Sequence, residues 1–150
     1  MRVLFRVGAA ALLAALLSTS ALAVTEAEYV AAGKRVSVRR LDPALRNIPL
    51  ERWLKRVLGR TAQLAWETND CGEATGSPAD SSRDLPVCVE ATGRVRDLTV
   101  SVSVALGSLE KGISGEPELW QAWIVQGDST ESCGSLSALA RSLERRHPEH

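Results

Sequence analysis

Histidine is scarce in this chain of 150 residues: the only two copies, His147 and His150, stand in the terminal HPEH. A Ser-His-Asp or Cys-His catalytic site needs an imidazole held in a packed geometry, which a chain end does not favour. Zinc sites use histidines and closely spaced cysteines, and the three cysteines here are far apart. We therefore expect no metal and no cofactor.

Several catalytic motifs are also missing. The chain has no C-x-x-C pair, which disfavours thiol redox chemistry, and no G-x-S-x-G, P-loop or H-E-x-x-H sequence. The sequence thus favours a protein without catalytic activity, and the chemistry left open is that of carboxylates.

No apolar run reaches the roughly 20 residues that a membrane-spanning helix needs. The longest apolar run covers only residues 7–17. It follows Arg2 and Arg6 and precedes the small-x-small site Ala21-Leu22-Ala23. This pattern predicts a secretory signal peptide over residues 1–23 that is cleaved after Ala23. We expect an exported protein, periplasmic or extracellular, without stable membrane insertion. The 15 arginines against three lysines would suit a high-GC bacterial genome.

Net charge is small after that cleavage. Of the 18 basic residues two lie in the signal peptide, so 16 remain against 18 acidic ones, a net charge of −2. Basic residues concentrate at 34–60 and acidic ones after them. The two halves either neutralise each other across the folded surface or leave a basic patch that binds an anionic partner. We expect no nucleic-acid partner, because the chain is exported and carries no binding motif.

The remaining chain has the size of a single domain. Residues 24–33 are expected to be a flexible N-terminus or a short helix, residues 34–146 one α+β domain, and residues 147–150 a flexible tail. Apolar residues spaced three and four positions apart share one face of a helix and predict one helix after Pro49 and another after Ser135. Alternation of period two predicts strands, which lie at 34–39, 61–70, 85–95, 97–106 and 118–126.

These elements predict the fold class. We expect an antiparallel sheet of three to five strands with one or two amphipathic helices on one face, as a single small disulfide-stapled domain. Trp53 of the first helix and Trp66 of a strand should share its core. Thr92-Gly93 is a turn or bulge signal, and residues 107–117 a turn-rich loop.

The cysteines admit three pairings. We favour Cys71–Cys88, which closes a short loop between consecutive strands in an oxidising compartment. Cys133 is then left over, in the Ser- and Gly-rich stretch STESCGS. It is either buried or exposed as a free thiol, and an exposed thiol could link two chains into a homodimer.

Two groups of residues are candidate binding sites. The first is the polar loop between Cys71 and Cys88, whose charged candidates are Asp70, Glu73, Asp80, Arg83 and Asp84. Paired carboxylates there could serve a glycosidase-type hydrolase, although solvated loops collect acids without any function.

The second group is Trp120 and Trp123. Three residues apart on one strand, they should point to opposite faces of the sheet, so that one leaves the core. An exposed indole could stack on a sugar or anchor a protein, or it could be covered by another part of the fold.

We therefore expect a small exported, non-catalytic binding or accessory protein, whose partner is an unknown protein or cell-envelope component. The alternatives are a cell-envelope or glycan-active hydrolase that uses the loop carboxylates, and a disulfide-linked structural dimer.

Overall fold

Residues 24–71 and 85–146 are described by the computed structural model, so the expected signal peptide and tail lie outside the described residues. A single five-stranded antiparallel sheet is built with every strand beside its neighbours in the chain, in the order β1-β2-β3-β4-β5. The strands are β1 (Gln63–Asp70), β2 (Pro86–Val95), β3 (Leu98–Ser108), β4 (Gly112–Gln126) and β5 (Ser129–Ser132).

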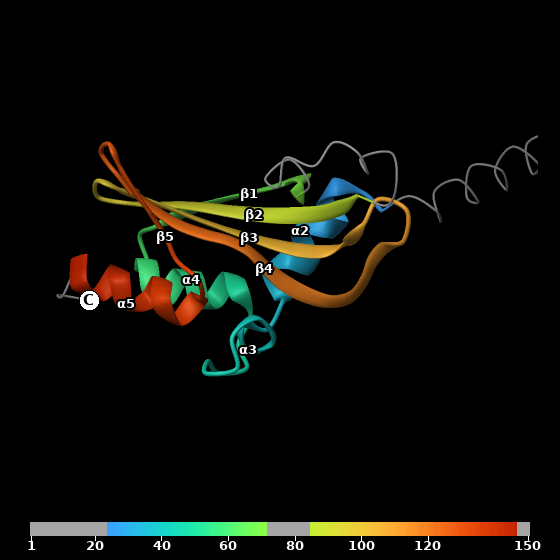
Figure 1. Ribbon diagram of the computed structural model, residues 1–150, viewed down its shortest axis with the longest axis horizontal. Helices are drawn as coiled ribbons and strands as arrows, with labels where there is room; N and C mark the ends of the chain where they lie inside the picture. Colours follow the sequence, from blue (N-terminus) through green and yellow to red (C-terminus); the bar gives the residue numbers. More distant parts are fainter. Residues whose placement is uncertain (1–23, 72–84, 147–150) are drawn as a thin grey trace, which may run out of the picture.

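Helices cover one face of this sheet, which we call the inner face; the opposite face is the outer face (Figure 1). The helices are α2 (Glu26–Arg35), α3 (Val38–Leu41), α4 (Leu50–Leu58) and α5 (Leu136–Arg146). Helices α4 and α5 lie side by side, while α2 packs against β1, β2 and β3. The α+β fold predicted from the sequence is confirmed.

The clearest sequence patterns form the elements they predict. Helix α4 buries Leu50, Trp53, Leu54 and Leu58, and Gly59 follows it with a positive φ of 102°. Strand β3 alternates as expected, with Val100 and Val102 almost fully buried against the helices. Apolar burial on this one face supplies the main driving force of folding.

One core holds both predicted tryptophans. Trp53 is 6% exposed, and the half-buried Trp66 of β1 packs against the same cluster. The ammonium of Lys34 lies 5.8 Å from the Trp66 ring centroid, a cation–π distance. The core therefore continues from α4 across β1 to α2.

The expected edge strand at 34–39 is wrong. Lys34 and Arg35 end helix α2, and Val38 begins α3. Only the caps Val36 and Ser37 separate the two helices, and Ser37, which is extended, forms an isolated bridge with Pro49. The alternation came from a two-residue junction between helices, where both valines turn inward.

Of the two expectations for residues 24–33, the structure shows the short helix, which begins at Glu26. Thr25 caps it by accepting a hydrogen bond from the Glu28 N–H, and Tyr29 is buried and donates to the Ser108 carbonyl. Gly33 lets the helix approach β2, because a Cβ there would lie 2.7 Å from Val89 Cγ1. Packing on the sheet explains the order of this segment.

Three further expectations about the strands need correction. Residues 107–117 are not one loop, since β3 continues to Ser108 and β4 already begins at Gly112. Gly93 marks no turn: it stays in register opposite Val100, and its missing Cβ makes room for Leu58. Strand β5 was not predicted, because its sequence STES carries no apolar alternation.

Candidate functional site

The disulfide joins Cys71 to Cys88, as predicted, with 5.2 Å between the Cα atoms. Asn69 is paired with Cys88 across β1 and β2, and Cys71 follows one residue after β1. The bond thus fastens the end of β1 to the start of β2. Both cysteines are buried, and both border a hollow on the outer face.

The expectation that Trp120 and Trp123 point to opposite faces is wrong because of a β-bulge. Ser103 of β3 pairs with Gln121, but the next residue, Val104, pairs with Leu119. Trp120 is therefore the extra residue of β4, which has no partner of its own in the ladder. The extra residue shifts the alternation, so that both indoles border the same outer hollow.

This outer hollow has a volume of about 400 Å³. Its lining is drawn from the last residues of β1 and the neighbouring parts of β2, β3 and β4: Asn69, Asp70, Cys71, Cys88, Glu90, Ser103, Trp120, Gln121 and Trp123. The size falls within the range of small-molecule sites. Two half-buried indoles, two carboxyl groups and two amides thus face one space.

A second carboxylate lies across the β1–β2 pair from Glu90, which lines this hollow. Glu90 lies directly opposite Glu67 in the β1–β2 register, and its Oε2 accepts a hydrogen bond from Ser103 Oγ at 3.2 Å. Like charges directly across a strand pair destabilise a sheet. The outer face therefore presents acceptor groups whose arrangement does not serve the stability of the sheet.

Trp123 offers an unsatisfied donor. Among the described residues, its Nε1 is the buried side-chain polar atom without a hydrogen-bond partner. A buried N–H without a partner costs about 1–3 kcal/mol, and such groups in native structures call for an explanation.

The sequence prediction identified part of this site. It named Trp120, Trp123 and Asp70, which the fold brings together. It left out Ser103 and Gln121, which belong to the same hollow. The predicted Glu73, Asp80, Arg83 and Asp84 lie outside the described residues.

Cys133 is a free thiol but it is not exposed. It is 8% exposed and belongs to the hydrophobic core, where its N–H donates to the Ala122 carbonyl. Burial raises the pKa of the Cys133 thiol, and the nearby Glu131 carboxylate raises this pKa further. The fold therefore does not expose the Cys133 thiol for a bond between two chains.

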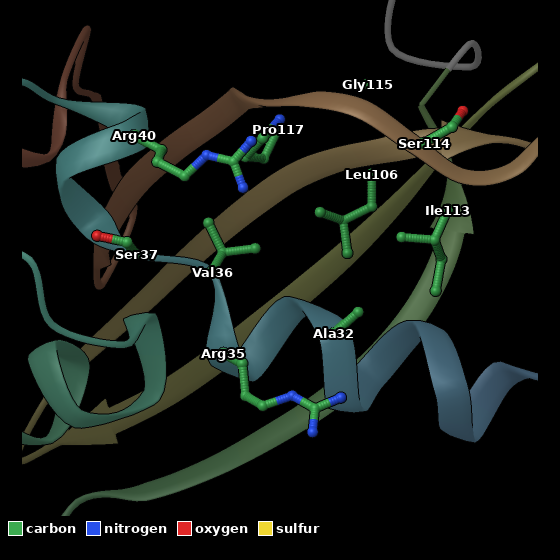
Figure 2. A pocket seen from close by; sticks show the side chains of 10 residues that line it. All are labelled: Ala32, Arg35, Val36, Ser37, Arg40, Leu106, Ile113, Ser114, Gly115 and Pro117. Carbon is green, nitrogen blue, oxygen red and sulfur yellow. The ribbon is translucent and has the colours of Figure 1, made fainter.

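A second cavity, of about 420 Å³, lies between the α2–α3 junction and the first half of β4. Figure 2 shows Arg35 and Arg40 among its lining side chains. Arg35 lies in the segment 34–39 that the sequence predicted as an edge strand, so this cavity was not expected.

The described residues contain neither a cluster of metal-ligating side chains nor a membrane-spanning helix. In residues 24–71 and 85–146, no three or more His, Cys, Asp or Glu side chains gather where a metal ion could bind. None of the helices seen there is long and apolar enough to cross a membrane. The chain matches no protein-family model, and no match was found among curated proteins or among solved structures.

Proposed function

We propose that this chain is a small exported, non-catalytic binding module that takes a glycan of the cell envelope in the outer hollow. The observation that carries the proposal is the bulge at Trp120, which puts two indoles beside Glu90 on one face. The signal-peptide pattern and the disulfide support export.

The chemistry of the hollow suits sugars. An indole presents a flat apolar face on which the C–H face of a sugar ring can stack, together with an N–H that can donate. Carboxylates accept strong, short hydrogen bonds from hydroxyl groups. The two indoles and the Glu90 and Asp70 carboxyl groups supply stacking faces and hydrogen-bond acceptors around one cavity.

The experiment titrates the mature protein with soluble peptidoglycan fragments and, separately, with N-acetylglucosamine oligosaccharides. Calorimetry and intrinsic tryptophan fluorescence report binding. We expect saturable binding that Trp120→Ala or Trp123→Ala weakens by about tenfold or more, the loss of a stacking contact. Trp123→Phe keeps an aromatic ring and should weaken binding less than Trp123→Ala.

Leu109→Ala is the matched control, because Leu109 is an apolar side chain 68% exposed outside the outer hollow. It should leave the affinity unchanged. Absence of binding by the wild-type protein, or equal binding by all variants, would overturn the proposal. Fragments should be recovered intact by mass spectrometry, and cleavage would instead favour the hydrolase that uses loop carboxylates.

A further inference from the structure

The second cavity has an apolar floor. Ala32 and Val36 come from α2 and its C-cap, Leu106 from β3, and Ile113 and Pro117 from β4 (Figure 2). Leu106 is 5% exposed, whereas Ile113 is 43% exposed. An exposed isoleucine beside a buried leucine leaves apolar surface that water covers in the unliganded protein.

The shape of β4 creates this space. Ala105 pairs with Glu118 and Gly107 with Ile113, so the four residues 114–117, which we call the β4 arch, stand opposite Leu106 alone. Gly115 takes a φ of +74°, and a Cβ there would meet nothing within 4 Å. The arch bends β4 toward the helices (Figure 1) and spans one side of the cavity.

Arg40, which lines the cavity, already binds a carboxylate, that of Glu116 on the arch. Arg40 Nε and Nη2 both donate to Glu116 Oε2 on the arch, at 3.3 and 2.8 Å. Both side chains are exposed, 49% for Arg40 and 79% for Glu116. Exposed ion pairs contribute about 0–1 kcal/mol, so another carboxylate can replace Glu116 at little cost.

The charge of the lining has one sign. Arg35 and Arg40 are the charged residues among those that line the cavity, and none of its lining residues is acidic. In Figure 2 the Arg40 guanidinium lies beside Pro117, next to the apolar floor, while Arg35 extends to the other side of α2. An anionic head beside an apolar tail matches this distribution.

We propose that this cavity binds a carboxylate-headed aliphatic molecule such as a fatty acid. The chain lies over Val36, Leu106 and Ile113, and the carboxylate takes the place of Glu116 on Arg40. The size of the cavity lies within the range of small-molecule pockets. This site is separate from the outer hollow and does not rest on the glycan proposal.

The experiment measures decanoate binding to the mature protein by calorimetry, with decyltrimethylammonium as a ligand of equal chain length and opposite charge. Decanoate should bind, and the cation should bind at least tenfold more weakly. Arg40→Gln should weaken decanoate binding by about tenfold, as expected for the loss of a charge-assisted hydrogen bond. Glu116→Gln should tighten it severalfold, because the competing carboxylate is gone.

Arg94→Gln is the matched control, since Arg94 is an exposed arginine of β2 that does not line this cavity. It should change nothing. A gain of affinity in Glu116→Gln cannot come from misfolding, so the pair of variants separates binding from stability. No decanoate binding, equal binding of the cation, or an unchanged affinity in Glu116→Gln would overturn the proposal.

Discussion

Asp42 and Ser137 hold together two segments that are 95 residues apart in the chain. Asp42 Oδ2 accepts hydrogen bonds from the Ser137 N–H at 2.9 Å and from Ser137 Oγ at 2.6 Å. Asp42 follows α3, and Ser137 stands in the first turn of α5. Because Asp42 is only 8% exposed, this contact replaces water around a carboxylate and fixes α5 against the N-terminal helices.

We predict that Asp42→Asn destabilises the protein by about 1–3 kcal/mol at neutral pH. The Ser137 hydroxyl, followed by backbone N–H groups of Ser137 and Ala44, lowers the pKa of Asp42 below 3.8. A lowered folded-state pKa gives stability that is present above pH 3.8 and lost as the pH falls through the folded value. Urea unfolding at pH 7 and below pH 4 should therefore show a difference between wild type and variant that shrinks in acid.

The control for this measurement is Asp128→Asn, because Asp128 is exposed in the turn between β4 and β5. It should unfold like the wild type at both pH values. A difference between Asp42→Asn and wild type that stays constant with pH would contradict the assigned role of the ionised carboxylate.

Gly33→Ala should destabilise the protein by about 1–3 kcal/mol through overpacking, although alanine is the better helix former. The new methyl would lie 2.7 Å from Val89 Cγ1 and 2.9 Å from Val89 Cβ, which a rotation of the valine does not relieve. Thermal and urea unfolding measure the loss. Gly134→Ala is the matched control, since a Cβ there meets nothing within 4 Å.

A second variant tests the cause. Gly33→Ala combined with Val89→Ala should lose less stability than the sum of the two single losses, because alanine at 89 lacks the Cγ atoms, one of which lies closest to the new methyl. Simple additivity of the two losses would argue against a clash between α2 and β2.

Replacement of Cys71 and Cys88 by serine should lower the free energy of unfolding by about 3 kcal/mol, the chain-entropy value for a loop of this length. The replacement should leave the sheet intact, because the β1–β2 ladder has eight residue pairs, from Gln63–Arg94 to Asp70–Val87, that do not depend on the bond. Urea unfolding gives the loss, and far-ultraviolet circular dichroism checks the fold. Equal stability with and without the disulfide would show that the loop is already restrained by other contacts.

Cys133 should react with a thiol reagent only when the protein unfolds. The native thiol is buried and its pKa is raised by that burial, so little reactive thiolate is accessible. The expected result is no labelling of the native protein by Ellman's reagent and one thiol per chain in denaturant. Rapid labelling of the native protein, or a dimer that a reducing agent dissociates, would contradict the buried position of Cys133.

Local patterns predicted most of the fold. The alternation at 97–106 and the helical spacing after Pro49 each reflect burial of one face, so the inner face could be recognised residue by residue. Residues 34–39 misled the prediction because two buried valines two residues apart occur at a helix junction as well as in a strand. Strand β5 escaped it because its four residues contribute hydrogen bonds to the sheet edge rather than apolar burial.

The candidate sites depend on irregularities that simple periodicity does not contain. The two tryptophans were predicted on opposite faces because one extra residue in β4, Trp120, shifts the alternation. Only the strand pairing, in which Ser103 and Val104 face the residues on either side of Trp120, reveals the shift. The β4 arch likewise comes from four residues opposite one. The glycines at 112 and 115, both with positive φ, were visible in the sequence as turn residues; Gly112 does follow the β3–β4 turn, but Gly115 lies in the β4 arch.

The sheet pairs each strand with the next one in the chain, and this has a consequence for how the molecule assembles. Each hairpin can close over a short stretch of chain, at small entropic cost, without waiting for distant segments. Docking of α5 onto Asp42 joins segments 95 residues apart, so we expect it to come late. Pulsed hydrogen exchange during refolding should show protection of β2 and β3 amides before those of α5. Simultaneous protection would mean that the Asp42–Ser137 contact forms together with the hairpins.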